Sequence, residues 1–176
     1  QDWAGYETDA ITGNFLKKGY AEGYWVGNAN VSFLHFSRTT DGSRVNNGAA
    51  SMKYHSPDGI TTVTLQGSWF TNGTKTPHAI SPLPAGTYDV SYMVYLEPGN
   101  TTQSFTTIVQ GGDTTLWDVS TLPRGEWVEI SNEIVVTADL VNKKFDLKMD
   151  ASENVGVTGE QIMYFDYLTW RPIEIR

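Results

Sequence analysis

Two pairs of carboxylates are close enough in the sequence to suggest hydrolytic chemistry. Hydrolysis of a glycosidic bond requires two carboxyl groups that face each other across a cleft, and the candidate pairs are Glu126/Glu129 and Asp146/Asp150. Neither pair lies in the Glu-x-Asp-x-x-Glu strand pattern of β-sandwich glucanases. We therefore interpret these side chains as solvated carboxylates on an acidic surface and expect no catalytic residue among them.

Other catalytic and metal-binding motifs are missing from the sequence. His35, His55 and His78 are scattered and form neither His-Glu-x-x-His nor another zinc spacing. There is no Gly-x-Ser-x-Gly elbow, and the lack of cysteine excludes thiol catalysis and a disulfide framework. We expect a protein that is not an enzyme and requires no cofactor, with a small β-sandwich hydrolase or lyase as the alternative.

Aromatic side chains offer a different chemistry, the stacking of a flat ring on the apolar face of a sugar. The chain has six Trp and nine Tyr residues; core packing explains many of them, but the excess of Trp indicates a ligand surface. Trp69 lies where a strand-like run enters a Gly- and Asn-rich loop, so its indole has little reason to be buried. We predict that Trp69 is a platform for a sugar ring, and a partial core or loop anchor is the alternative.

Length, composition and charge indicate one acidic globular domain. The chain of 176 residues, 39% hydrophobic and 18% charged, is expected to fold as a single domain over 1–176. Its net charge of −8 disfavours nucleic acid and anionic membranes as partners, and no apolar run approaches the roughly 18 residues of a membrane span. Cysteine-free chains are normal among bacterial secreted proteins, and we expect a secreted or cell-surface bacterial protein.

Short alternating runs rich in Val, Ile, Thr, Tyr and Phe dominate the chain, and helical periodicity is nearly absent. Turn signals such as Pro57-Asp58-Gly59 and Pro84-Ala85-Gly86 separate these runs. The clearest runs are 31–37, 49–54, 61–66, 86–96, 104–110, 126–136, 144–150 and 163–170. Strands and turns at this spacing predict an all-β fold, an antiparallel β-sandwich.

Alternation assigns the two faces of the most regular runs. In the run 86–96 the core positions are Tyr88, Val90, Tyr92 and Val94, which turns Tyr95 away from the core. In the run 144–150 the apolar positions alternate with Asp146, Lys148 and Asp150. A sheet face that carries these polar groups suits a polar ligand.

Four motifs follow one another as they do in carbohydrate-binding modules of the family 4, 9 and 22 type. Gly42–Tyr54 resembles the family's early strand with Gly, small residues and Ser-hydrophobic-Lys, and Leu83–Tyr92 resembles its Gly-x-Tyr-x-hydrophobic-Ser-aromatic strand. Gly125–Val128 resembles the Gly-x-Trp strand start, and Met163–Leu168 the closing strand. The resemblance implies a β-jelly roll whose concave sheet forms an open groove for a glycan chain, commonly xylan or a β-glucan.

The resemblance also implies the residues of the groove. The family places a second platform in the interval of Trp117, whereas Trp127 matches a structural core position; Trp25 is also expected in the core, and Trp170 outside the groove. The further candidates for sugar contact, on segments expected to line or rim the groove, are Phe70, Asn72, Tyr95, Gln103, Gln110, Arg124, Lys148 and Asp150.

One metal ligand is implied by the resemblance. Asp166 resembles an aspartate of the closing strand that helps to bind a structural Ca²⁺ in many relatives, where backbone carbonyls complete the shell. Relatives often carry Glu directly after the first-strand Phe, but here Leu16 follows Phe15. A buried aspartate satisfied by backbone amides is the alternative for Asp166.

The sequence therefore predicts a non-catalytic module that binds a neutral β-linked polysaccharide, xylan ahead of β-glucan. As a partner within the same chain we expect the catalytic domain of a glycoside hydrolase, which the module would target to its substrate. An adhesion module that binds a protein is a second alternative, because a fold does not fix a function.

Overall fold

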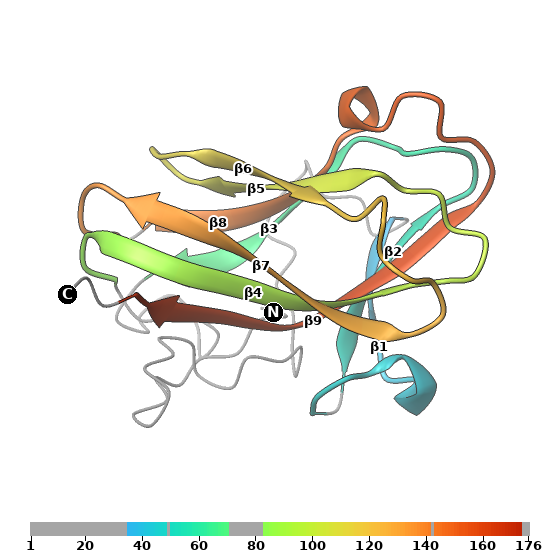
Figure 1. The fold of residues 1–176 in the computed structure, drawn as a ribbon, viewed down its shortest axis with the longest axis horizontal. Coiled ribbons are helices and arrows are strands. Elements are labelled where there is room, and N and C mark those ends of the chain that lie inside the picture. The colour runs from blue at the N-terminus through green and yellow to red at the C-terminus, as the bar shows by residue number, and fades with distance from the viewer. Residues whose placement is uncertain (1–34, 49, 71–82, 142, 174–176) are drawn as a thin grey trace.

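The protein is a sandwich of two antiparallel β-sheets. A computed structural model describes residues 35–48, 50–70, 83–141 and 143–173, apart from the side chains of Arg38 and 66–70. The two sheets form the two layers of Figure 1. Among the described residues no helix is long and apolar enough to cross a membrane.

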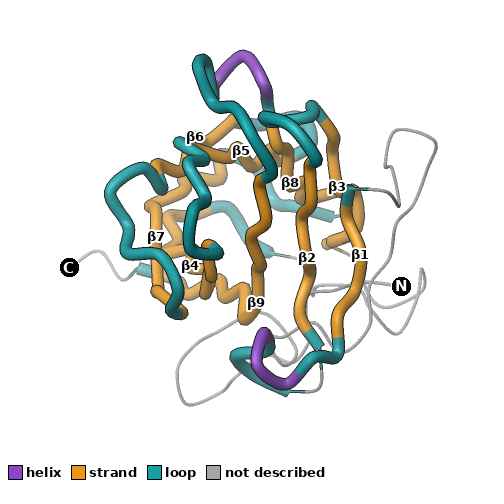
Figure 2. The backbone as a smooth tube through the Cα atoms, turned by 90° about the vertical axis from the view of Figure 1, so that its right-hand side faces the viewer, coloured by secondary structure: helices purple, strands orange, loops and turns teal. Residues whose placement is uncertain are grey.

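The five-stranded sheet has the order β1-β2-β9-β4-β7, which Figure 2 shows side by side. Its strands are β1 (Phe36–Thr39), β2 (Ser51–Ser56), β9 (Gln161–Pro172), β4 (Gly86–Leu96) and β7 (Trp127–Val136). The pairing of β4 with β9 shifts register between Ser91 and Met93. This bulge shapes the outer face of the sheet.

The four-stranded sheet has the order β3-β8-β5-β6. Its strands are β3 (Val63–Phe70), β8 (Lys143–Met149), β5 (Ser104–Val109) and β6 (Thr114–Asp118). Two short 3₁₀ helices, η1 (Gly42–Arg44) and η2 (Ala151–Glu153), lie in connections. From β3 to β9 the chain passes repeatedly between the sheets, with the β5–β6 hairpin inside one sheet, so the predicted all-β jelly-roll sandwich is confirmed.

The core between the sheets is built from the inward positions that alternation predicts. All four predicted core positions of β4 are buried: Tyr88, Val90, Tyr92 and Val94. An aromatic cluster fills one part of this core, where Tyr92 and Phe165 meet the ring of Phe105 edge-on. Trp170, expected outside the groove, is fully buried and packs edge-on against Phe145 at 4.9 Å between centroids.

Candidate functional site

The outer face of the four-stranded sheet carries a polar stripe along β8. The core side of β8 buries Phe145, Leu147 and Met149. The side chains that alternate with them, Lys144, Asp146 and Lys148, therefore project from the outer face of the sheet. Directly paired residues of neighbouring strands share a face, and the register pairs Lys148 with Thr64 and Thr106, and Asp146 with Ile108. We call the resulting surface the β8 face, made of Thr64, Thr106, Ile108, Lys144, Asp146 and Lys148.

Asp146 is the most unusual group of the β8 face. Its Oδ1 atom is buried and has no hydrogen-bond partner in the part of the chain that the structure describes. Burial raises the pKa of Asp146 from 3.8 to about 6, although the charge of Lys144 opposes this shift. A buried polar atom without a partner costs free energy, so this oxygen is an acceptor that a hydroxyl group of a ligand could satisfy.

Lys148 and Asp150, two predicted sugar contacts, lie close together. Lys148 Nζ is 3.4 Å from Asp150 Oδ2. Asp150 also caps η2, since its Oδ1 accepts hydrogen bonds from Ser152 N at 3.0 Å and Ser152 Oγ at 2.7 Å. These bonds from Ser152 lower the pKa of Asp150. Lys148 therefore belongs to the β8 face, whereas Asp150 mainly holds the turn that follows it.

Trp117 lies in the core, which corrects the prediction that it forms an exposed platform. Its exposed fraction is 1%, and its ring stacks on Phe105 with centroids 5.4 Å apart. The indole Nε1 donates a hydrogen bond to Thr107 Oγ1 at 2.9 Å. In β6 the indole takes the inward position and Leu116 is 52% exposed, because the larger ring fills more of the space between the sheets.

The predicted roles of Trp69 and Phe70 in sugar binding stay predictions. Their backbones belong to β3 and pair with Lys144 and Lys143 of β8, respectively, but their side chains lie outside the described part. Asn72, and Trp25 with its expected core position, lie outside the described residues altogether.

Arg124 has a structural role, which corrects the prediction of a sugar contact. Its guanidinium donates to the carbonyl oxygens of Asn100, Thr102, Val119 and Leu122 at 2.6–3.0 Å. Burial of this group lowers the pKa of Arg124. These bonds clamp the two loops that flank it.

Two predicted glutamine contacts bind backbone atoms near the ends of β5. Gln103 Nε2 donates to Val155 O at 2.9 Å, and Gln110 Oε1 accepts from Lys144 N at 3.0 Å. Both side chains are exposed. They tie neighbouring segments together, and their role in sugar binding stays a prediction.

The carboxylate of Asp166 accepts hydrogen bonds from three backbone N–H groups. Oδ2 accepts from Asn46 at 3.0 Å and Asn47 at 2.9 Å, and Oδ1 accepts from Tyr167 at 2.8 Å. This arrangement is that of a buried aspartate that accepts hydrogen bonds from backbone amides, the alternative given for it above, and Ca²⁺ binding by Asp166 stays a prediction. No group of three or more His, Asp and Glu side chains that could hold a metal ion occurs among the described residues.

A cluster of aromatic rings and an arginine on the outer face of the five-stranded sheet was missed by sequence reasoning. Tyr95 lies on this face, as alternation predicts, and packs edge-on against Trp127 at 5.6 Å and Tyr164 at 6.0 Å. The guanidinium of Arg44 lies 4.3 Å from the centre of the Tyr95 ring. Its Nε and Nη2 atoms donate hydrogen bonds to the carboxylate of Glu97 at 2.7 and 2.8 Å.

This cluster changes the predicted roles of two rings. Trp127, expected in the core, is half-buried on the outer face. Tyr95 is only 8% exposed, so it supports its neighbours and offers little surface as a platform of its own. Alternation predicts the outward position of Tyr95, and the same alternation through β7 could have placed Trp127 outward, but the pairing of the two residues follows from the register of the strands.

Comparisons with known proteins connect the chain to solved structures only. No family model matches the sequence, and no curated protein matches it. An arabinose-bound α-L-arabinofuranosidase, MgGH51, is similar with 18% identity and a TM-score of 0.50; the match covers 80% of this chain and 22% of that chain. The chain thus spans about a fifth of the length of that enzyme.

Two smaller structures have lower scores. The module TmCBM61, in complex with β-1,4-galactotriose, is 16% identical over 78% of this chain and 81% of that chain, with a TM-score of 0.47. The CBM22-1 xylan-binding domain from Paenibacillus barcinonensis is 13% identical over 80% and 82%, with a TM-score of 0.42. These two likenesses carry no conclusion about this chain, and the match to MgGH51, at 18% identity and a TM-score of 0.50, shows a shared fold and nothing beyond it.

Proposed function

We propose that this chain is a non-catalytic module that binds a neutral β-linked polysaccharide on the β8 face, xylan ahead of β-glucan. The observation that carries the proposal is the buried Oδ1 of Asp146 on an outer sheet face, which has no hydrogen-bond partner within the described ranges of the chain. In the full protein the module would hold an attached glycoside hydrolase on its substrate, as the sequence resemblance implies. The same resemblance suggests a secreted or cell-surface protein.

The β8 face offers the groups that a sugar chain requires. A sugar hydroxyl donates to Asp146 Oδ1, and Lys148 donates to a hydroxyl or ring oxygen. Ile108, paired with Asp146 in the register, gives an apolar contact for the C–H face of the ring, and we retain Trp69 as the stacking platform. An open face buries little area and dehydrates many hydroxyls, so we expect a Kd on the order of 10 μM.

The spacing of Asp146 and Asp150 supports binding without hydrolysis. Asp146 and Asp150 are four residues apart along one extended segment, which separates their backbones by about 13 Å at roughly 3.3 Å per residue. Glycosidases place their two carboxyl groups roughly 5–9.5 Å apart. Asp150 also turns its oxygens toward Ser152 and Lys148, so the pair does not form a hydrolytic site.

Calorimetric titration with xylohexaose and with mixed-linkage β-glucan oligosaccharides tests the proposal at pH 5.0 and pH 7.5. Affinity is expected to rise with pH, because the ionised Asp146 accepts a stronger hydrogen bond than the neutral acid. The pKa of about 6 places the change between these two values. Asp146→Asn is expected to weaken binding about fivefold at pH 7.5 and to remove most of the pH dependence.

Controls separate this site from the rest of the protein. Glu126→Gln removes a charge of the same sign from an exposed position just before β7 and is expected to bind like the wild type. Trp69→Ala is expected to weaken binding at least tenfold, as loss of one stacking platform would. Unchanged affinity in both Asp146→Asn and Trp69→Ala would refute the β8 face as the site, and release of reducing or unsaturated sugars would instead indicate an enzyme.

A further inference from the structure

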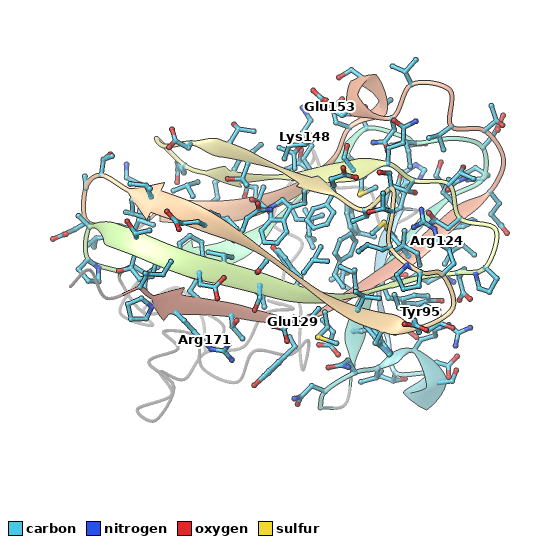
Figure 3. All side chains as sticks on the ribbon, in the orientation of Figure 1. Tyr95, Arg124, Glu129, Lys148, Glu153 and Arg171 are labelled. Carbon is cyan, nitrogen blue, oxygen red and sulfur yellow. The ribbon has the colours of Figure 1, made fainter. Side chains whose placement is uncertain are left out.

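A hollow lies on the outer face of the five-stranded sheet, the layer opposite the β8 face. Its volume is about 230 Å³, and its walls include Asn47, Ser91, Met93, Glu129, Tyr167 and Arg171. We call it the bulge pocket. Figure 3 shows Glu129 and Arg171 on the outer side of this sheet, whereas Lys148 lies on the side of the four-stranded sheet.

The backbone builds this pocket. The register shift between Ser91 and Met93 interrupts the pairing of β4 with β9, and Tyr167 adopts a positive φ of 49° at this interruption. A tyrosine rarely adopts this left-handed conformation, so the surrounding structure must hold it there. The carboxylate of Asp166 does so: it accepts the N–H of Tyr167 and binds the loop that carries Asn47.

Two charged groups of opposite sign border the pocket. Arg171 Nε is buried and has no hydrogen-bond partner among the residues that the structure describes. Glu129 is exposed on β7 and pairs with Met93 across the strands. Between them the hydroxyls of Ser91 and Thr169 share a hydrogen bond. The pocket therefore offers one strong donor and one strong acceptor over a small polar floor.

The chemistry of these groups selects a neutral, hydroxyl-bearing ligand. Arg171 requires an acceptor and Glu129 requires a donor, and a pair of neighbouring hydroxyl groups supplies both. The register pairs Asp89 with both Arg171 and Glu133, so two further carboxylates occupy this face and repel an anionic ligand. A single neutral sugar residue matches both the polarity and the size of the hollow, which is below the roughly 300 Å³ of drug-sized pockets.

A half-exposed indole lies beside the pocket. Trp127 precedes Glu129 by two residues on β7 and shares its face, which places the two about 7 Å apart along the strand. The ring packs edge-on against Tyr95 of the neighbouring strand, and Tyr95 is in turn covered by the guanidinium of Arg44, which pairs with Glu97. A supported, half-exposed indole can stack on the sugar next to the one in the pocket.

We propose that the outer face of the five-stranded sheet is a second glycan-binding site, in which the bulge pocket takes one neutral sugar residue and Trp127 stacks on its neighbour. This inference rests on the proposed function for its class of ligand. Because the two sites lie on opposite layers, one molecule holds two polysaccharide chains or two segments of one chain. Binding to an insoluble polysaccharide then gains affinity from the second contact.

Calorimetric titration with xylohexaose, cellohexaose and β-1,4-galactotriose measures the number of sites. The wild type is expected to bind two molecules of at least one of these ligands. Arg171→Met, which keeps the length of the side chain and removes its donors, is expected to weaken the second site at least tenfold and to leave one site. Asp146→Ala is expected to leave the other site, and the double variant to leave none.

Matched variants and a charged ligand complete the test. Lys53→Met removes a half-buried cation from β2 of the same sheet and is expected to keep both sites. Trp127→Ala is expected to weaken the second site tenfold, while Trp127→Phe retains part of the affinity; unfolding curves identify any loss caused by misfolding. Galacturonic acid trimers are expected not to bind the pocket.

The outcomes distinguish this inference from the proposed function. One site in the wild type that Arg171→Met leaves unchanged would overturn the second site, while the β8 face would stand. Tighter binding of the galacturonic acid trimer than of neutral ligands, lost in Arg171→Met, would overturn the class of ligand. No binding of any oligosaccharide would remove both the proposed function and this inference.

Discussion

Replacing Asp146 by Asn should make the protein more stable at neutral pH and leave its stability unchanged in acid. The carboxyl group has a pKa of about 6 in the folded protein, against 3.8 ordinarily, because burial disfavours its charged form. Between about pH 4 and pH 6 the folded chain therefore holds more protons than the unfolded chain. By linkage, this group's contribution to stability is complete below pH 4 and is lost as the pH rises toward and above 6.

The magnitude follows from the same shift. A change in pKa from 3.8 to about 6 corresponds to roughly 3 kcal/mol, and partial exposure of this carboxyl to solvent reduces it to about 1 kcal/mol. Asparagine has nearly the same shape and carries no charge, so it avoids this penalty at every pH. We expect Asp146→Asn to raise the free energy of unfolding by about 1 kcal/mol at pH 7.5 and by about zero at pH 4.0.

Urea unfolding at pH 4.0, 5.0, 6.0 and 7.5 measures this difference directly. An unchanged m-value would show that the variant alters stability and not the extent of unfolding. Glu126→Gln, measured in parallel, corrects for the change in net charge. If Asp146→Asn lowers stability at pH 7.5, or changes it equally at all four pH values, the oxygen has a partner and the reasoning for the β8 face fails.

Three further predictions concern Trp117, Arg124 and Asp166. Trp117→Ala should lower the free energy of unfolding, measured by urea titration, by about 3–5 kcal/mol. Its affinity for xylohexaose should be unchanged under conditions in which the variant is folded. Weaker binding by the fully folded variant would instead indicate that Trp117 is a sugar platform. Arg124→Met should lower the free energy of unfolding by about 2–3 kcal/mol, because several carbonyl oxygens lose a charged donor, and Arg124→Lys should lower it less. Equal melting temperatures of the wild type and both variants would contradict a structural role for Arg124. EDTA should leave the melting temperature unchanged, since three backbone amides already donate hydrogen bonds to Asp166. A drop in the melting temperature that Ca²⁺ reverses would show that the protein binds Ca²⁺.

The strands and their faces could be predicted because alternation is a local property. In β4 the inward set was correct at every position, and in β8 the polar residues lie on the face opposite Phe145, Leu147 and Met149. The strand β6 was not predicted, although it supplies a buried Trp. Its run Thr114–Asp118 places Leu116 beside Trp117, so either side chain could have faced the core from the pattern alone.

The tertiary roles of single polar residues could not be predicted from the sequence. Arg124 donates to carbonyl oxygens on two loops, those between β4 and β5 and between β6 and β7, and nothing in its neighbours indicates those partners. Asp166 accepts amides from a loop that precedes it by about 120 residues in the chain. Such contacts depend on which strands the sheets bring together, and the order β2-β9-β4 is a property of the whole fold.

The two proposed sites follow from one physical argument about unsatisfied polar atoms. Most of the rings that are described serve the core, so the aromatic content of the chain does not locate a ligand. Asp146 Oδ1 and Arg171 Nε, in contrast, are buried on opposite faces of the sandwich and have no hydrogen-bond partner in the portion of the chain that is described, and each costs stability in the free protein. A ligand hydroxyl would relieve that cost. Stability and affinity should therefore change in opposite directions when Asp146 becomes Asn, the signature expected of a binding site and not of a structural residue.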